Sequence, residues 1–105
     1  MTIPLTTGDA APDFELVDQD DQVVRLSRFR GKNVVLYFYP KDETPGCTKE
    51  ACTFRDDYEV FQKADAEVIG ISADSPESHR GFAKRHCLPF RLLSDTDGAI
   101  QKLYR

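Results

Sequence analysis

Two cysteines, Cys47 and Cys52, stand five positions apart, directly after Thr44, Pro45 and Gly46. Thr44 suits the N-cap of a helix and Pro45 its first position, where a missing N–H costs nothing, so Cys47 falls in the first helical turn. The backbone N–H groups of that turn are unpaired and carry the positive end of the helix dipole, which favours a thiolate over a thiol. Cys47 is therefore the predicted reactive residue.

The helix start alone does not ionise a thiol. An ordinary cysteine is only ~3% thiolate at pH 7 and needs about 3.4 kcal/mol of stabilisation to be mostly ionised. A helix N-terminus supplies about 0.3 to 1 kcal/mol, or about 2 kcal/mol when partly buried. Hydrogen bonds from the Thr44 hydroxyl and nearby N–H groups add about one or two more. The difference leaves room for a positively charged side chain near Cys47, most naturally an arginine.

The spacing of Cys47 and Cys52 does not fit a disulfide on an intact helix. Five residues correspond to a rise of ~7.5 Å and a rotation of ~140°, which puts the two Cα atoms about 8.7 Å apart. A disulfide requires Cα atoms within about 7 Å. If these cysteines form a disulfide, the first turns of the helix must unwind, so we expect oxidation to be coupled to local loss of helix.

The rest of the chain alternates between predicted strands and helices, which favours an α/β fold with a parallel sheet and right-handed crossovers. The run Val34–Tyr39 is β-branched and aromatic throughout, as in a strand covered on both faces. We expect this strand at the centre of the sheet, ended by Pro40. The buried stripe of the helix that contains Cys47 would consist of Ala51, Phe54, Tyr58 and Phe61.

The remaining elements follow from local signals. The polar residues 18–21 between two apolar runs suggest a hairpin, and the Ser75-Pro76 pair repeats the cap-then-proline start of a helix. The predicted elements are strands over Phe14–Val17 and Val23–Leu26, a short helical turn capped by Ser27, a buried strand over Val68–Ser72, a helix to about His86, a third strand over Phe90–Leu93 and a helix over Ala99–Arg105.

Composition limits the classes of function. The chain has 105 residues, enough for one domain, and its 40% hydrophobic and 30% charged content is typical of a globular protein. The 14 basic residues are scattered among 18 acidic ones, which disfavours nucleic acid as a partner. No run approaches the ~20 apolar residues that span a bilayer, and residues 1–5 lack a basic signal-peptide start. We expect a cytoplasmic location, or an organelle stroma if a transit peptide has been removed.

The segment from Pro40 to Cys52, PKDETPGCTKEAC, resembles the active-site segment of the peroxiredoxins, whose pattern is Pro-x-x-x-Thr-x-x-Cys. The second cysteine five residues after the first is similar to that of the bacterioferritin comigratory protein, or peroxiredoxin Q, subgroup. Further matches run through most of the chain, at Gly8–Phe14, Leu36–Pro40, Ile69–Ser72 and Leu92–Asp95.

The resemblance implies a thioredoxin-like fold and the reduction of hydrogen peroxide or organic hydroperoxides without a metal or organic cofactor. Cys47 would be the peroxidatic residue, whose thiolate attacks a peroxide oxygen and becomes a sulfenic acid. Cys52 would be the resolving residue, forming an intramolecular disulfide that thioredoxin or a similar dithiol reduces. Thr44 would hydrogen-bond the peroxide, and Pro40 would shield the thiolate pocket from water. Members of the subgroup are commonly monomeric, so we expect a monomer.

The chain departs from the family pattern at its C-terminal end. The family's active-site arginine lies on a strand beyond this point, and Arg105 does not occupy its place. The same segment supplies strands that pair beside the strand corresponding to Val34–Tyr39, which would here be left at an open edge. We therefore expect residues 1–105 to be a single domain without its C-terminal strands, weakly stable and weakly active alone.

Other interpretations of the cysteines remain open. A thioredoxin-like dithiol carrier or redox sensor would exchange disulfides without reducing peroxide, although carriers usually show Cys-x-x-Cys, in which the sulfurs meet without unwinding. An inactive fragment is a further alternative, because of the absent arginine. Cys87 is expected to be a free, semi-buried thiol near a helix end. A zinc site of the three cysteines with His79 or His86 is disfavoured, because a five-residue helical step does not aim two sulfurs at one ion.

Overall fold

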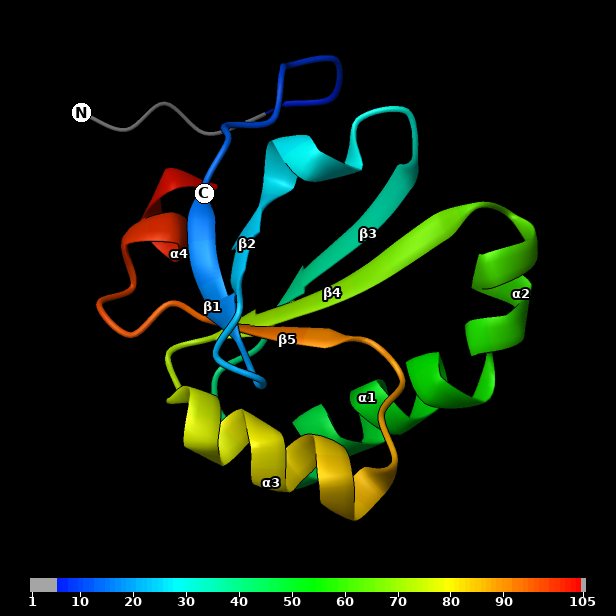
Figure 1. Ribbon diagram of the computed structural model, residues 1–105, viewed down its shortest axis with the longest axis vertical. Helices are drawn as coiled ribbons and strands as arrows, with labels where there is room; N and C mark the ends of the chain where they lie inside the picture. The colour runs from blue at the N-terminus through cyan, green and yellow to red at the C-terminus, as the bar shows by residue number, and fades with distance from the viewer. Residues whose placement is uncertain (1–5, 105) are drawn as a thin grey trace.

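The computed structural model describes residues 6–104, which form a five-stranded sheet with helices on both faces (Figure 1). The strand order is β2-β1-β5-β4-β3. The strands are β1 Glu15–Asp18, β2 Val23–Arg25, β3 Asn33–Phe38, β4 Ala66–Ser72 and β5 Arg91–Ser94. The helices are the 3₁₀ turn η1 Leu26–Phe29, α1 Pro45–Asp56, α2 Tyr58–Lys63, α3 Pro76–His86 and α4 Ala99–Leu103.

The sheet is mixed. β3, β4 and β5 run parallel, whereas β1 is antiparallel to both β2 and β5. The predicted α/β class, the hairpin and the parallel strands are confirmed. Among residues 6–104, none of the helices has the length and apolar character needed to cross a bilayer. Arg105, the last residue of the predicted C-terminal helix, lies outside the described residues.

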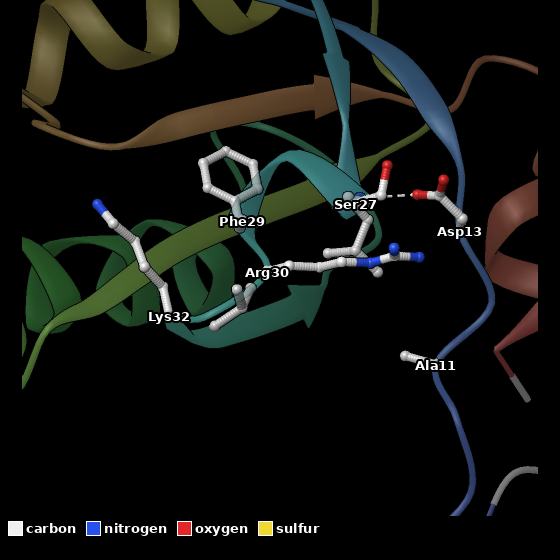
Figure 2. A pocket seen from close by; sticks show the side chains of 8 residues that line it. Ala11, Asp13, Ser27, Phe29, Arg30 and Lys32 are labelled. Atoms are coloured by element: carbon white, nitrogen blue, oxygen red, sulfur yellow. Dashed lines mark hydrogen bonds between the residues drawn. The ribbon is translucent and has the colours of Figure 1, made fainter.

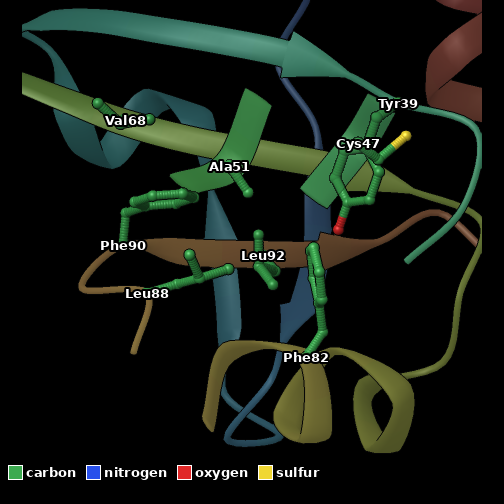
Figure 3. Close-up of a cluster of buried hydrophobic side chains, with 8 residues drawn as sticks. All are labelled: Tyr39, Cys47, Ala51, Val68, Phe82, Leu88, Phe90 and Leu92. Atoms are coloured by element: carbon green, nitrogen blue, oxygen red, sulfur yellow. The ribbon is translucent and has the colours of Figure 1, made fainter. Parts of the chain in front are cut away.

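Each face of the sheet buries its own hydrophobic cluster, because alternate residues of a strand point to opposite sides. In β5, Leu92 belongs to the cluster that includes residues of α1 and α3, and Leu93 belongs to the one that includes residues of η1 and α4. The buried residues of the first cluster are Tyr39, Cys47, Ala51, Val68, Phe82, Leu88, Phe90 and Leu92 (Figure 3). Those of the second are Phe14, Val24, Phe29, Ile69, Ile71 and Leu93.

β3 is an edge strand in the part of the chain that the structure describes, where it pairs only with β4. The prediction of a central position is therefore wrong for residues 6–104, and the expectation of an open edge is confirmed. Both faces of β3 are nonetheless covered, since Tyr37 packs against the first cluster and Leu36 against the second. An apolar run reports burial of a strand's faces and carries no information about its edges.

Two local predictions need correction. The helix after Thr44 is two helices, because α1 ends at Asp56 and α2 begins at Tyr58. Asp56 and Asp57 have low helix propensity and carry negative charge at a helix C-terminus, which accounts for the break. Ser27 lies inside η1 and does not cap it with its side chain; its backbone N–H instead donates to Asp13 Oδ1 at 2.8 Å.

Gly70 of β4 makes room for an aromatic layer that joins the sheet to α1. A Cβ atom at Gly70 would lie 2.8 Å from Cζ of Tyr37 on the neighbouring strand. The Tyr37 ring packs against Tyr39 with centroids 5.5 Å apart and against Phe54 of α1 at 4.7 Å. The glycine therefore fixes how closely β3 and α1 approach each other.

We expect Gly70→Ala to lower the free energy of unfolding of the intact protein by about 1 to 3 kcal/mol, the usual cost of overpacking. Urea unfolding followed by circular dichroism measures the change. Gly46→Ala in α1 is the matched control, because a Cβ atom added at Gly46 would meet nothing within 4 Å, and it should be neutral or slightly stabilising. Identical unfolding midpoints for Gly70→Ala and wild type would contradict the close packing.

Candidate active site

Cys47 occupies the third position of α1, with Thr44 as N-cap and Pro45 at the first position, as predicted. The Thr48 N–H donates to the Thr44 carbonyl at 2.8 Å, which leaves the N–H groups of Gly46 and Cys47 without an intrahelical acceptor. Cys47 is only 8% exposed. It belongs to the first cluster, and its sulfur is directed away from the cluster's centre (Figure 3). The thiol is thus shielded from water at a helix start that offers unpaired donors.

Thr44 and Pro40 flank the loop between β3 and α1. The Thr44 hydroxyl donates to the Lys41 carbonyl at 2.9 Å and makes no side-chain bond to the helix, so Thr44 is an N-cap by its backbone alone. Because its proton is engaged, the hydroxyl oxygen remains available as an acceptor. Pro40 is the second residue after β3 and is exposed in the described part of the chain.

Cys52 is half-buried on the same uninterrupted helix as Cys47, and both are free thiols. The helix is intact from Pro45 to Asp56, so the separation of about 8.7 Å expected for a five-residue helical step applies to their Cα atoms. The two sulfurs can bond only if the first turns of α1 unwind.

Cys87 is the C-cap of α3, in the left-handed conformation at φ 52°. It is exposed, so the prediction of a semi-buried thiol is wrong.

Arg55 of α1 donates from Nη1 to the His86 carbonyl at 2.9 Å. A hydrogen bond to Asp56 raises the pKa of Arg55, against an opposing effect of burial, and the nearby Cys52 and Cys87 add to the rise. Within residues 6–104, the arginine side chains that form hydrogen bonds have partners other than Cys47.

Sequence reasoning missed a buried hydrogen-bond network beside the loop that precedes α1. His79 and Asp42 are 0% and 4% exposed, and Nδ1 of His79 lies 2.7 Å from Oδ2 of Asp42. The Tyr39 hydroxyl donates to Oδ1 of Asp42 at 2.6 Å, and the Ser78 hydroxyl donates to Oδ2 at 2.9 Å. The signal in the sequence was His79 itself, three residues before Phe82 on the buried face of a helix, where an imidazole needs a partner.

The proton positions in this network follow from its acceptors. Nε2 of His79 lies 3.1 Å from the Leu93 carbonyl, which only accepts, so Nε2 carries a proton. Burial opposes ionisation of the Asp42 carboxyl, but hydrogen bonds from His79 and Tyr39 outweigh it and lower its pKa. Burial and the Asp42 carboxylate raise the pKa of Tyr39, which stays a donor. Asp42 is therefore a carboxylate, and both ring nitrogens of His79 lie within hydrogen-bond distance of acceptors.

The polar atoms of this network already have hydrogen-bond partners within the protein, so the network does not require a metal ion. Ligand atoms of Asp42, Asp74 and His79 lie within 4.8 Å of one another, close enough for a shared cation. Both Asp42 oxygens already accept from protein donors, however, and Oδ2 of Asp74 accepts from the Asp42 N–H at 2.8 Å and the Ser72 hydroxyl at 2.7 Å. His79 has no free nitrogen, so it is not available to the zinc site considered from the sequence either.

A separate pocket lies on the second-cluster face, beside η1 (Figure 2). Its volume is about 260 Å³. Its lining consists of Ala11, Asp13, Leu26, Ser27, Phe29, Arg30, Lys32 and Val34. Cys47, Cys52 and Thr44 are not among these residues, so this hollow is not where the predicted thiol chemistry takes place.

Comparison with known proteins establishes the family. The model of the AhpC/TSA family matches residues 7–105. The chain belongs to this family. Chloroplastic peroxiredoxin Q of Populus jackii is 62% identical over 95 residues, which are 90% of this chain and 45% of that protein. Chloroplastic peroxiredoxin Q of Sedum lineare is 60% identical over 98 residues, 93% of this chain and 53% of that protein. The chain spans about half the length of these curated relatives.

Solved structures of the family have the same fold. Peroxidoxin BcpB from Mycobacterium tuberculosis superposes with a TM-score of 0.90 at 43% identity, covering 93% of this chain and 64% of that chain. A structure of Xanthomonas campestris bacterioferritin comigratory protein, described for its alkyl peroxide reduction activity, gives a TM-score of 0.85 at 36% identity, covering 87% and 58%. The resemblance to the peroxiredoxins and the thioredoxin-like fold are confirmed.

The Asp42–His79 pair makes stability depend on pH. Folding lowers the pKa of Asp42. The stabilisation is therefore complete above the pKa of an unfolded aspartate, about 3.9, and is lost as pH falls through the lower folded value. At neutral pH, Asp42→Asn should lower the free energy of unfolding of the intact protein by about 1 to 3 kcal/mol, because it leaves buried hydrogen-bond partners of the carboxylate unsatisfied. The difference from wild type should narrow below about pH 4.

Urea unfolding of wild type and Asp42→Asn at neutral and acidic pH measures both effects. Asp56→Asn is the control, because its ion pair with Arg55 is on the surface and should contribute less than about 1 kcal/mol. A loss of stability in Asp42→Asn that is the same at both pH values would show that ionisation of Asp42 is not what stabilises the fold.

Proposed function

We propose that the protein carrying this chain is a thiol-dependent peroxidase that reduces hydrogen peroxide and organic hydroperoxides. The observation that carries the proposal is the shielded Cys47 thiol in the first turn of an intact helix, among N–H groups without an intrahelical acceptor and three residues after the N-cap Thr44. Membership of the AhpC/TSA family and relatives named peroxiredoxin Q support it.

In the first step, the Cys47 thiolate attacks one oxygen of the hydroperoxide. The O–O bond breaks, the leaving oxygen takes a proton and departs as water or alcohol, and the sulfur becomes a sulfenic acid. The Gly46 and Cys47 N–H groups stabilise the negative charge, and the Thr44 oxygen accepts a hydrogen bond from the peroxide O–H. Pro40 shields this pocket from water in the intact protein, where an arginine supplies the remaining positive charge.

In the second step, the Cys52 thiol condenses with the sulfenic acid. An S–S bond forms and water leaves, so no cofactor is consumed. The step requires the first turns of α1 to unwind, because the Cα atoms on the intact helix are too far apart. Thioredoxin or a similar dithiol then reduces the disulfide by exchange, and α1 can reform.

Location and assembly are part of the same proposal. The relatives from Populus jackii and Sedum lineare are named chloroplastic. Of the two locations expected from the sequence, we therefore propose an organelle stroma over the cytoplasm. That residues 1–105 belong to a single domain, and that the protein is a monomer, stay predictions.

The cysteine roles are tested in the intact protein with hydrogen peroxide and a sulfenic acid trap, followed by mass spectrometry. We expect Cys47→Ser to abolish sulfenic acid formation and peroxide consumption. Cys52→Ser should form the sulfenic acid at Cys47 but no intramolecular disulfide. Cys87→Ser is the matched control and should behave as wild type.

The same experiment separates the peroxidase from the alternatives. A dithiol carrier would leave peroxide untouched while its cysteines still exchanged with a disulfide substrate, and an inactive protein would do neither. Either result with the intact wild-type protein would overturn the proposed function.

A further inference from the structure

We propose that Asp42 and His79 are positioning residues that set how readily α1 unwinds. They thereby determine how the sulfenic acid at Cys47 divides between disulfide formation and further oxidation. The inference about the sulfenic acid rests on the proposed function, whereas the inference about unwinding rests on the network alone. Asp42 lies two residues before Thr44, so it holds the chain where α1 begins.

Asp42 is tied to the body of the fold by both its main chain and its side chain. Its N–H donates to Oδ2 of Asp74, after β4, at 2.8 Å. Its carboxylate accepts from His79 at 2.7 Å and from Ser78 at 2.9 Å, both on α3. The Thr44 hydroxyl then ties the helix start to the same loop through the Lys41 carbonyl. The first turn of α1 is thus connected to α3 through the hydrogen bonds of a buried carboxylate.

The other contacts between this loop and α3 are weaker. Glu43 accepts from Nε2 of His86 at 3.1 Å and forms an ion pair with Arg85, and all three side chains are partly open to solvent. Exposed ion pairs contribute little to stability, whereas loss of a buried partner of a carboxylate costs much more. At the far end of α1, Arg55 binds the His86 carbonyl. The Cys47–Cys52 segment therefore lies between two contacts with α3. The buried contact, between Asp42 and His79, is at the Cys47 end, and the contact of Arg55 is at the other end.

The strength of the buried contacts of Asp42 with His79 and Ser78 determines which of two reactions the sulfenic acid undergoes. Condensation with the Cys52 thiol forms the S–S bond, releases water and requires an unwound α1. Reaction with a second hydroperoxide transfers an oxygen to the Cys47 sulfur, giving a sulfinic acid and an alcohol or water, and takes place at the intact helix start. A firmly held loop keeps α1 wound and increases the share of sulfinic acid. A loosened loop favours the disulfide.

His79→Gln tests this in the intact protein, because it removes the ring nitrogen that lies 2.7 Å from the Asp42 carboxylate. In the reduced protein without peroxide, we expect alkylation of the buried Cys47 by iodoacetamide to be about tenfold faster, since the thiol becomes accessible when the helix opens. With excess hydrogen peroxide, the share of sulfinic acid measured by mass spectrometry should fall about tenfold. The rate of the first attack on peroxide should change less than about twofold, because α1 is still wound in most molecules.

His86→Gln is the matched control, a histidine on the same helix whose pair with Glu43 is on the surface. It should stay within about twofold of wild type in all three measurements. Ser78→Ala, which removes one hydrogen bond to Asp42, should shift alkylation and sulfinic acid in the same directions as His79→Gln by about two- to fivefold. It provides the test if His79→Gln does not fold.

Unchanged alkylation and unchanged sulfinic acid in Ser78→Ala and in folded His79→Gln would overturn the proposal. The proposal would also be overturned if the rate of the first attack on peroxide fell by as large a factor as the share of sulfinic acid. That result would indicate general damage to the site. Faster alkylation in a protein whose wild type forms no sulfenic acid would support the role in unwinding and refute the proposed function instead.

Discussion

Two requirements on the first turn of α1 cannot be met at the same time. In the proposed mechanism, the N–H groups of the helix start favour the reacting form of Cys47 only while that turn is wound, and the Cys47 sulfur reaches Cys52 only after the turn has opened. A helix held too loosely would lose the reactive thiolate, and one held too firmly would prevent disulfide formation. The elements around α1 have to keep it wound and still allow it to open.

The sheet and α3 supply the first half of this balance. The first hydrophobic cluster buries one side of α1 against β4, β5 and α3, and Gly70 lets the Tyr37 ring lie between the sheet and Phe54. The Asp42–His79 pair fixes the loop that leads into the helix. The ability to open comes from α1 itself. The helix presents a narrow apolar stripe to the core, in which Cys47 and Ala51 are the buried residues. Unwinding the first turns therefore displaces few buried side chains.

Much of this arrangement could be predicted from local signals. Thr44-Pro45 and Ser75-Pro76 gave correct helix starts, and the apolar runs gave β3 and β4, because these signals act within a few residues. The position of Cys47 in the first turn of α1 followed from the same local signals. What could not be predicted depends on contacts distant in sequence. His79 and Asp42 are separated by 37 positions, and no periodicity indicates that they meet. The edge position of β3 was expected only from the family resemblance, since burial of its two faces gives an apolar run in either place.

Amide hydrogen exchange of residues 47–55 in the intact protein, compared between the fully reduced and the peroxide-oxidised forms, tests the central claim most directly. We predict slow exchange in the reduced form, where α1 is wound, and fast exchange at these residues after oxidation, when Cys47 and Cys52 are joined. Equally slow exchange in both forms would show that the helix does not unwind, and the account of α1 as an opening helix would be wrong.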